Sequence, residues 1–180
     1  KNVRREITKI SQGIQSPELQ SRLGSDVYLN KTKGSDNRLL NADYVKDERI
    51  ITTGKFYALI IAVQDYSDDN IKDLDFPIND AEKLYNVLTD NYMFKKENVK
   101  FIKNVGKQEI LQELDHFNGI INEDDNFLIF YAGHGYYDES FKQGYWLPEN
   151  AIKDKRGTWL SNSIIQDYLR GIPSRNTLLI

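Results

Sequence analysis

Two uninterrupted apolar runs, FYALIIAV at 56–63 and FLIFYA at 127–132, constrain the fold of this chain more than any other feature. Neither shows the apolar–polar alternation of a strand with one wet face, so each is typical of a strand buried on both faces of a parallel sheet. The segments VKFIK (99–103) and NTLLI (176–180) predict two further strands. The chain therefore offers four strands for one buried sheet.

Helical periodicity separates these strands. A first helix is predicted by apolar residues at helical spacing, namely Ile78, Ala81, Leu84 and Leu88. A second covers 107–121, and a third covers 161–173, with Ser161 as its cap and Pro173 as its stop. Strands that alternate with amphipathic helices predict an α/β fold, a mostly parallel central sheet with helices on both faces.

The first third of the chain has a different composition. Residues 1–54 are polar and rich in Ser, Asn, Lys and Gly, with one helix predicted over 17–23, where Ser16 can cap it. We interpret 1–54 as a linker or the end of a preceding region that packs on the domain formed by 55–180. The chain begins with Lys1 and stops within an apolar run, so we expect it to be part of a longer protein.

Charge and composition exclude several classes of function. The net charge is −3 and no basic stripe is present, so we expect no direct contact with nucleic acid. The apolar runs are too short to span a bilayer and no signal peptide is recognisable, which predicts a cytoplasmic protein without a membrane partner. The absence of cysteine excludes disulfides and thiolate metal sites from this segment.

The candidate catalytic residue is His134, in the segment FLIFYAGHGYY. It follows the carboxyl end of a predicted parallel strand, where the chemistry of such sheets gathers. Gly133 and Gly135 would let the backbone turn sharply, approach a substrate and leave the Gly135 N–H free to donate. The alternative is a histidine in a tight turn that is satisfied locally. His116 falls on the polar side of the 107–121 helix, and we expect it to be solvated.

Five segments in order carry a resemblance to a known family: YALIIAVQDY, PINDAEKLYNVL, FYAGHG, GYWLPEN and TLLI. Over 55–180 the chain resembles the large-subunit half of caspase-like cysteine peptidases, of the metacaspase and bacterial caspase-homologue kind. The resemblance implies the caspase–haemoglobinase fold, a three-layer sandwich. In that family the strand corresponding to TLLI leads into an Asp-x-Cys motif. The chain would then stop just before its catalytic cysteine, and this fragment alone would be inactive.

The resemblance also implies roles for individual residues. His134 would activate the cysteine thiol, because an adjacent imidazole favours the thiolate, and the Gly135 N–H would hold the oxyanion together with the cysteine N–H. Asp80, in the PIND segment, would contribute to an acidic pocket for Arg or Lys before the scissile bond. Equally, Asp80 can be a first-turn helix residue that satisfies backbone N–H groups.

The same resemblance bears on two further properties, the alternative specificity for aspartate and the dependence on calcium. Animal caspases bind substrate aspartate through arginines, so Arg156, Arg170 and Arg175 leave that specificity open. The positions that match metacaspase calcium ligands are neutral here, namely Gln143, Ser161 and Asn162. We therefore expect no cofactor and regard calcium dependence as doubtful, since Ca²⁺ requires several carboxylate oxygens. We interpret the acidic runs DYSDDN (65–70) and NEDDN (122–126) as solvated turns.

Our first hypothesis is a caspase-type cysteine endopeptidase, one module of a larger bacterial protein that is switched on by a sensor or partner domain. Its partners would be a peptide substrate and the C-terminal remainder of the same protein, which would carry the cysteine. The alternative from another class is a catalytically inactive homologue that acts as a scaffold. A flavodoxin-like or receiver domain using Asp65 would explain the α/β pattern and leave GHG unexplained.

Overall fold

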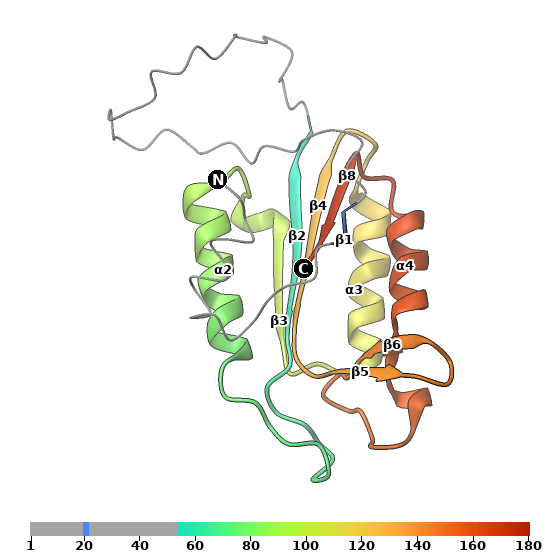
Figure 1. Ribbon diagram of the computed structural model, residues 1–180. Coiled ribbons are helices and arrows are strands. Elements are labelled where there is room, and N and C mark those ends of the chain that lie inside the picture. Colours follow the sequence, from blue (N-terminus) through green and yellow to red (C-terminus); the bar gives the residue numbers. More distant parts are fainter. Residues whose placement is uncertain (1–19, 22–53) are drawn as a thin grey trace, which may run out of the picture.

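A five-stranded sheet forms the centre of the molecule, and the computed structural model describes residues 54–180 together with strand β1 (Figure 1). In spatial order the strands are β1 (Gln20–Ser21), β8 (Asn176–Leu179), β4 (Asn126–Ala132), β2 (Phe56–Ala62) and β3 (Val99–Lys103). The last four run parallel to one another, and β1 runs antiparallel to β8. The four predicted strands and their parallel arrangement are confirmed.

Strand β1 corrects one prediction. The sequence predicted a helix over 17–23, whereas Gln20 and Ser21 pair with Leu179 and Leu178 of β8. The edge of β8 presents backbone N–H and C=O groups that need partners, and this ladder prevails over the local helix-start signal. The interpretation of 1–54 as a linker or the end of a preceding region otherwise falls outside the described residues.

Helices cover both faces of the sheet, as predicted. Helix α2 (Pro77–Asn91) lies on one face, and α3 (Lys107–Ile120) and α4 (Asn162–Gly171) lie on the other (Figure 1). Ser161 caps α4 as predicted, since its hydroxyl accepts the Ile164 N–H. The result is a three-layer sandwich with one core on each side of the sheet.

Strand β2 shows why the apolar runs are uninterrupted. All seven of its residues are buried, because β3 and β4 flank it and helices cover both of its faces. Leu59 and Ile61 belong to the core beneath α3 and α4, and Ala58 and Ile60 belong to the core beneath α2. Full burial of such side chains stabilises the fold by about 1.5–3 kcal/mol each for the larger ones.

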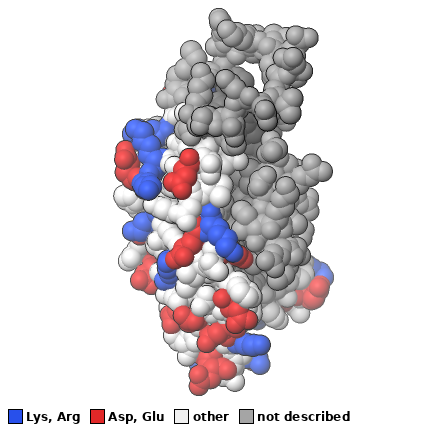
Figure 2. Space-filling model, turned by 90° about the vertical axis from the view of Figure 1, so that its left-hand side faces the viewer, with Lys and Arg blue, Asp and Glu red and all other residues white. Residues whose placement is uncertain are grey.

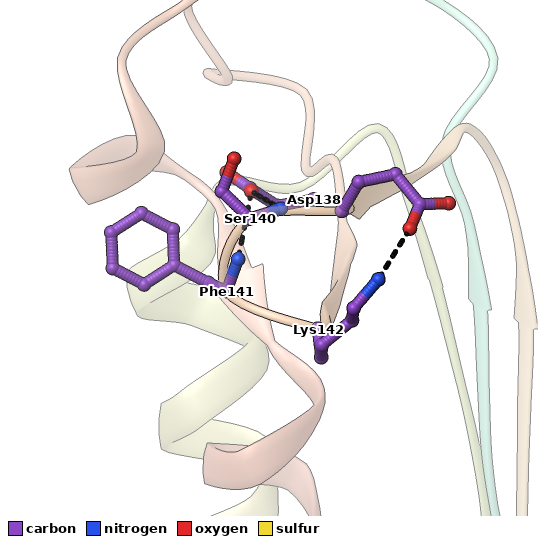
Figure 3. Close-up of polar contacts among 5 residues, drawn as sticks. Asp138, Ser140, Phe141 and Lys142 are labelled. Atoms are coloured by element: carbon purple, nitrogen blue, oxygen red, sulfur yellow. Dashed lines mark hydrogen bonds and ion pairs between the residues drawn. The ribbon is translucent and has the colours of Figure 1, made fainter.

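A second, three-stranded antiparallel sheet was not predicted. It contains β5 (Gly135–Asp138), β6 (Gln143–Trp146) and β7 (Leu160–Ser161). The tip of the β5–β6 hairpin is closed by the Asp138 carboxylate, which accepts the backbone N–H groups of Ser140 (3.0 Å) and Phe141 (3.1 Å), as Figure 3 shows. Lys142 has a positive φ of 50° in this turn. Two single-turn 3₁₀ helices, η1 (Lys96–Asn98) and η2 (Arg156–Thr158), complete the elements.

The two ends of the parallel strands carry different connections. The loop 64–76, the β4–β5 junction and the start of α2 lie where the strands end, which we call the carboxyl edge (Figure 1). At the opposite, amino edge, Asp125 and Asn126 are buried, so the prediction of a solvated turn over 122–126 was wrong for these two residues. In the part of the chain that the structure describes, no helix has the length and apolarity to cross a membrane.

Candidate active site

The backbone of His134 is fixed from both sides. It lies two residues beyond the end of β4, at the carboxyl edge, and is half-buried. Its N–H donates to the Tyr66 hydroxyl oxygen at 2.8 Å. Its carbonyl accepts the Leu147 N–H at 3.0 Å and the Tyr131 hydroxyl at 3.1 Å. The structure therefore holds this residue far more tightly than a solvated turn would.

The imidazole of His134 has one nitrogen engaged by the backbone. Its Nε2 lies 2.8 Å from the carbonyl oxygen of Lys72. A carbonyl can only accept, so Nε2 must carry the proton, and Nδ1 then presents a lone pair in the neutral ring. The Tyr66 ring packs against the imidazole, with 5.1 Å between ring centroids. The histidine is thus held in the tautomer whose Nδ1 can accept a proton.

The two tyrosine hydroxyls around His134 are neutral hydrogen-bonding groups. Burial raises the pKa of Tyr66, which belongs to the 64–76 loop and is 9% exposed. Burial raises the pKa of Tyr131 well above its usual range, and its hydroxyl also donates to the Leu147 carbonyl at 2.8 Å. Tyr131 is further fixed by stacking on Trp146, with 4.5 Å between ring centroids.

The two glycines beside His134 differ in the space that surrounds them. Neither has a left-handed φ. A Cβ on Gly133 would lie 2.6 Å from the Tyr131 hydroxyl oxygen, so a side chain here would force Tyr131 to move. A Cβ on Gly135 would meet only the Tyr145 carbonyl oxygen, at an ordinary 3.6 Å. The backbone bends at Gly133, in line with the expected turn, and this glycine also makes room for Tyr131, whereas Gly135 is the first residue of β5.

The direction of the Gly135 N–H follows from the β5–β6 ladder. The Leu147 N–H donates to the His134 carbonyl, and the register pairs Gly135 with Trp146. Hydrogen-bonded and non-hydrogen-bonded pairs alternate in an antiparallel ladder. Gly135 and Trp146 therefore form a non-hydrogen-bonded pair, and the Gly135 N–H points away from β6. An oxyanion donor requires this orientation.

Strand β8 runs beside β4 toward the same edge. Ile129 pairs with Leu179, the Ile180 N–H donates to the Ile129 carbonyl at 2.9 Å, and the Tyr131 N–H donates to the Ile180 carbonyl at 3.0 Å. The backbone of Ile180 therefore lies level with Phe130, four residues short of His134 on the neighbouring strand. The strand before His134 and the strand that contains TLLI are therefore parallel neighbours in the sheet.

A model of the caspase domain family matches residues 55–180. The chain belongs to the caspase domain family. Among solved structures, it is similar to the protein GSU0716 from Geobacter sulfurreducens, with a TM-score of 0.54, 15% identity, and coverage of 67% of this chain and 47% of that one. It is also similar to the Drosophila initiator caspase Dronc, with a TM-score of 0.50, 14% identity, and coverage of 82% and 61%.

These similarities define the fold. At such identities the two solved structures show a shared caspase-like architecture, and the chain spans about half of one and three-fifths of the other. No curated protein matches the chain. The family is one of cysteine peptidases, so the caspase domain described here has a peptidase fold.

Asp80 occupies the first turn of α2, at the carboxyl edge of the caspase domain. Its side chain is 14% exposed, and its carboxylate lies 3.4 Å from the Lys83 ammonium. The backbone N–H of Asp80 donates to the Phe76 carbonyl, and no side chain caps the start of α2. Within the described residues Asp80 makes no hydrogen bond to His134, and its carboxylate has no cation from another element.

The three candidate arginines lie in different places. Arg156 pairs with Asp138 at 2.7 Å and lies over the Phe141 ring, close to the carboxyl edge. Arg170 pairs with Asp167 in the last turns of α4. Arg175 precedes β8 at the amino edge, so it and Arg170 lie at the far end of the strands from His134.

The 64–76 loop gives the carboxyl edge an acidic character. It carries Lys72 and five aspartates, namely Asp65, Asp68, Asp69, Asp73 and Asp75. Figure 2 shows mixed charges over α2 and acidic side chains gathered below it, where this loop lies. Hydrogen bonds from the Asn70 and Lys153 backbone lower the pKa of Asp68. No ion pair of the described residues includes any of the five aspartates.

The three positions considered for calcium lie near one another around Gly144. Gln143 precedes it on β6, and Ser161 pairs with the neighbouring Tyr145. The Asn162 side chain contacts the space that a Gly144 side chain would need. The Ser161 hydroxyl is engaged as the α4 cap. Among residues 54–180, no group of three or more His, Cys, Asp or Glu side chains is placed to hold a metal.

The sequence did not predict two contacts of His134. The Lys72 carbonyl is a backbone group, which carries no residue signature. Tyr66 lies in the run interpreted as a solvated turn, and this was wrong because Tyr66 is 9% exposed and bonds to His134. A lone aromatic residue in an otherwise acidic loop was the available signal. His116 is exposed, as predicted.

Proposed function

We propose that this caspase domain is the histidine-bearing part of a cysteine endopeptidase, with the nucleophile in a segment that follows Ile180. The observation that carries the proposal is the contact of His134 Nε2 with the Lys72 carbonyl. It leaves Nδ1 as a base at the edge toward which β8 runs. A histidine that served only the fold would have no need of a free, fixed base at this position.

The strand register supports the position of the nucleophile. Leu179 pairs with Ile129, so a strand that continues β8 would reach the level of His134 about four residues beyond Ile180. A cysteine there would lie on the strand next to the histidine. An adjacent imidazole lowers the pKa of a thiol and stabilises its thiolate.

The chemistry then follows from the groups in place. Nδ1 of His134 takes the thiol proton, and the thiolate attacks the substrate carbonyl. The Gly135 N–H and the cysteine N–H hold the resulting oxyanion. The imidazolium, stabilised by the Lys72 carbonyl, gives its proton to the leaving amine, and water hydrolyses the acyl-enzyme.

We further propose a preference for Arg or Lys before the scissile bond. Asp80 supplies a largely buried carboxylate at the carboxyl edge, and among the described residues its charged partner is Lys83 on the same helix. The five aspartates of the 64–76 loop attract a basic peptide toward this edge. In the whole protein the domain would act as a regulated protease module.

The test compares two lengths of the protein. The 180-residue chain has no cysteine, so it should cleave no peptide. The full-length protein should cleave peptides that contain Arg or Lys, and iodoacetamide should abolish this activity. Cleavage by the 180-residue chain would refute the thiol mechanism. A full-length protein that folds, lacks a cysteine after Ile180 and cleaves nothing would indicate the scaffold hypothesis.

A further inference from the structure

Two groups that hold His134 come from the same loop. The Tyr66 hydroxyl accepts the backbone N–H of His134, and the Lys72 carbonyl accepts its imidazole Nε2–H. These contacts span 68 and 62 residues of sequence. The 64–76 loop therefore contacts both the main chain and the ring of His134, which lies between β4 and β5.

The loop is closed so that these two contacts keep a fixed separation. The Tyr66 N–H donates to the Asp73 carboxylate at 2.8 Å. At the base of the loop, the Leu74 N–H donates to the Gln64 carbonyl at 2.9 Å. The Gln64 N–H in turn donates to the Asn104 side chain at 2.8 Å, which ties the loop to the end of β3.

Tyr66 restricts the orientation of the His134 imidazole in two ways. Its hydroxyl anchors the peptide N–H of His134, and its ring packs on the imidazole at an interplanar angle of 40°. A half-turn of the imidazole about its bond to Cβ would exchange Nδ1 with Cδ2 and Nε2 with Cε1. The Nε2–H would then leave the Lys72 carbonyl, and the contact that fixes the tautomer would be lost. The packed tyrosine ring and the anchored peptide both oppose that half-turn.

We propose that Tyr66 is a positioning residue that keeps His134 in its Nε2–H tautomer, with Asp73 holding Tyr66 in place through the loop. Its effect on turnover rests on the proposed function, whereas its effect on the tautomer does not. The acidic loop is then part of the catalytic framework as well as an electrostatic surface.

The tautomer can be measured without any substrate. In the full-length protein labelled with ¹⁵N-histidine, long-range ¹H–¹⁵N spectra report which ring nitrogen is protonated, and the loss of a signal in His134→Gln assigns His134. The parent should show the Nε2–H form alone. Tyr66→Phe should show a mixture of tautomers. Tyr57→Phe, which alters another buried tyrosine at the far end of β2, should match the parent. A parental spectrum in Tyr66→Phe would overturn the proposal.

Kinetics supply the second measurement. Tyr66→Phe should lower kcat about 10-fold, the effect of one lost hydrogen bond, with KM within about twofold of the parent. Asp73→Asn should lower kcat less, because the amide oxygen can still accept the Tyr66 N–H. An unchanged kcat in Tyr66→Phe would contradict a role in positioning. If the parent cleaves nothing, the proposed function fails, and the spectra alone decide the proposal on the tautomer.

Discussion

The two ends of the parallel strands contain polar clusters that differ in one respect. At the amino edge, Asp125 is 5% exposed, and its carboxylate accepts the N–H groups of Lys55 (2.7 Å) and Asn122 (2.9 Å). Its own carbonyl accepts the Arg175 N–H at 2.8 Å. At the carboxyl edge, the cluster around His134 is equally well fixed, yet among the described residues Nδ1 has no hydrogen-bond partner, and the Gly135 N–H points away from β6.

This difference distinguishes the Asp125 cluster, which stabilises the fold, from the His134 cluster, which could also bind another molecule. The carboxylate at the amino edge binds the starts of strands β2 and β4 together, and all its bonds are made within the fold. At the carboxyl edge the internal bonds orient groups whose remaining bonding capacity is free for another molecule. Substitutions at the two edges should therefore have opposite effects on stability and on activity.

The largest effect is expected at His134. In the full-length protein, His134→Ala should lower kcat by at least about 10³-fold, because it removes the base of a nucleophile–base pair. Its free energy of unfolding should change by less than about 1 kcal/mol, since the side chain is half-buried. Peptide cleavage and urea denaturation measure the two quantities. His116→Ala, at an exposed histidine, is the control and should alter neither.

The next largest effect concerns specificity. Asp80→Asn should reduce the preference for Arg or Lys over neutral residues by about 30- to several-thousand-fold, because losing one partner of a desolvated charge pair costs roughly 2–5 kcal/mol. A positional-scanning peptide library measures this ratio. If Asp80 serves only its helix, the loss of its charge from the first turn should instead lower stability by about 0.3–1 kcal/mol and leave the ranking of substrates unchanged.

At the amino edge the expected effect is on stability. Asp125→Ala should lower the free energy of unfolding by about 1–3 kcal/mol, because it removes the buried carboxylate that accepts the backbone N–H groups of Lys55 and Asn122. The kcat of the folded protein should stay parental. Asp124→Ala, at the exposed neighbouring aspartate, is the matched control for urea denaturation. Equal stability of the two variants would show that the Asp125 cluster is not structural.

The smallest effect distinguishes the two glycines. Gly133→Ala should destabilise the fold by about 1–3 kcal/mol, because the new methyl group displaces the Tyr131 hydroxyl. Gly135→Ala should change stability by less than about 0.5 kcal/mol, since its methyl group meets one carbonyl oxygen at ordinary distance. Thermal melts of both variants measure the difference. Similar melting temperatures would remove the distinction between the glycines.

The sequence predicted the parts of the fold that depend on local pattern. Uninterrupted apolar runs identified β2 and β4 because full burial on both faces leaves no room for polar residues. The same pattern placed His134 at the carboxyl edge. The β5–β6 hairpin was missed because its residues are half-buried or exposed and show no alternation of apolar and polar side chains.

The parts that depend on distant partners could not be predicted. Asp125 and Tyr66 were both taken for residues of solvated turns, yet each is buried by segments far away in the sequence. The acceptor for the His134 ring is a backbone carbonyl, so the identity of Lys72 gives no indication of its role. The roles of Asp80 and Gly135 in binding a substrate stay predictions.

Covalent trapping tests most directly whether a thiolate lies beside His134. The full-length protein would be treated with a peptidyl chloromethyl ketone that ends in arginine, and the modified residue would be located by peptide mass mapping. A single adduct is expected on a cysteine within about four residues beyond Ile180, at the level of His134 in the β4–β8 register, and His134→Ala should abolish it. The absence of any adduct in a folded protein, or an adduct that forms equally well in His134→Ala, would contradict a cysteine activated by this histidine.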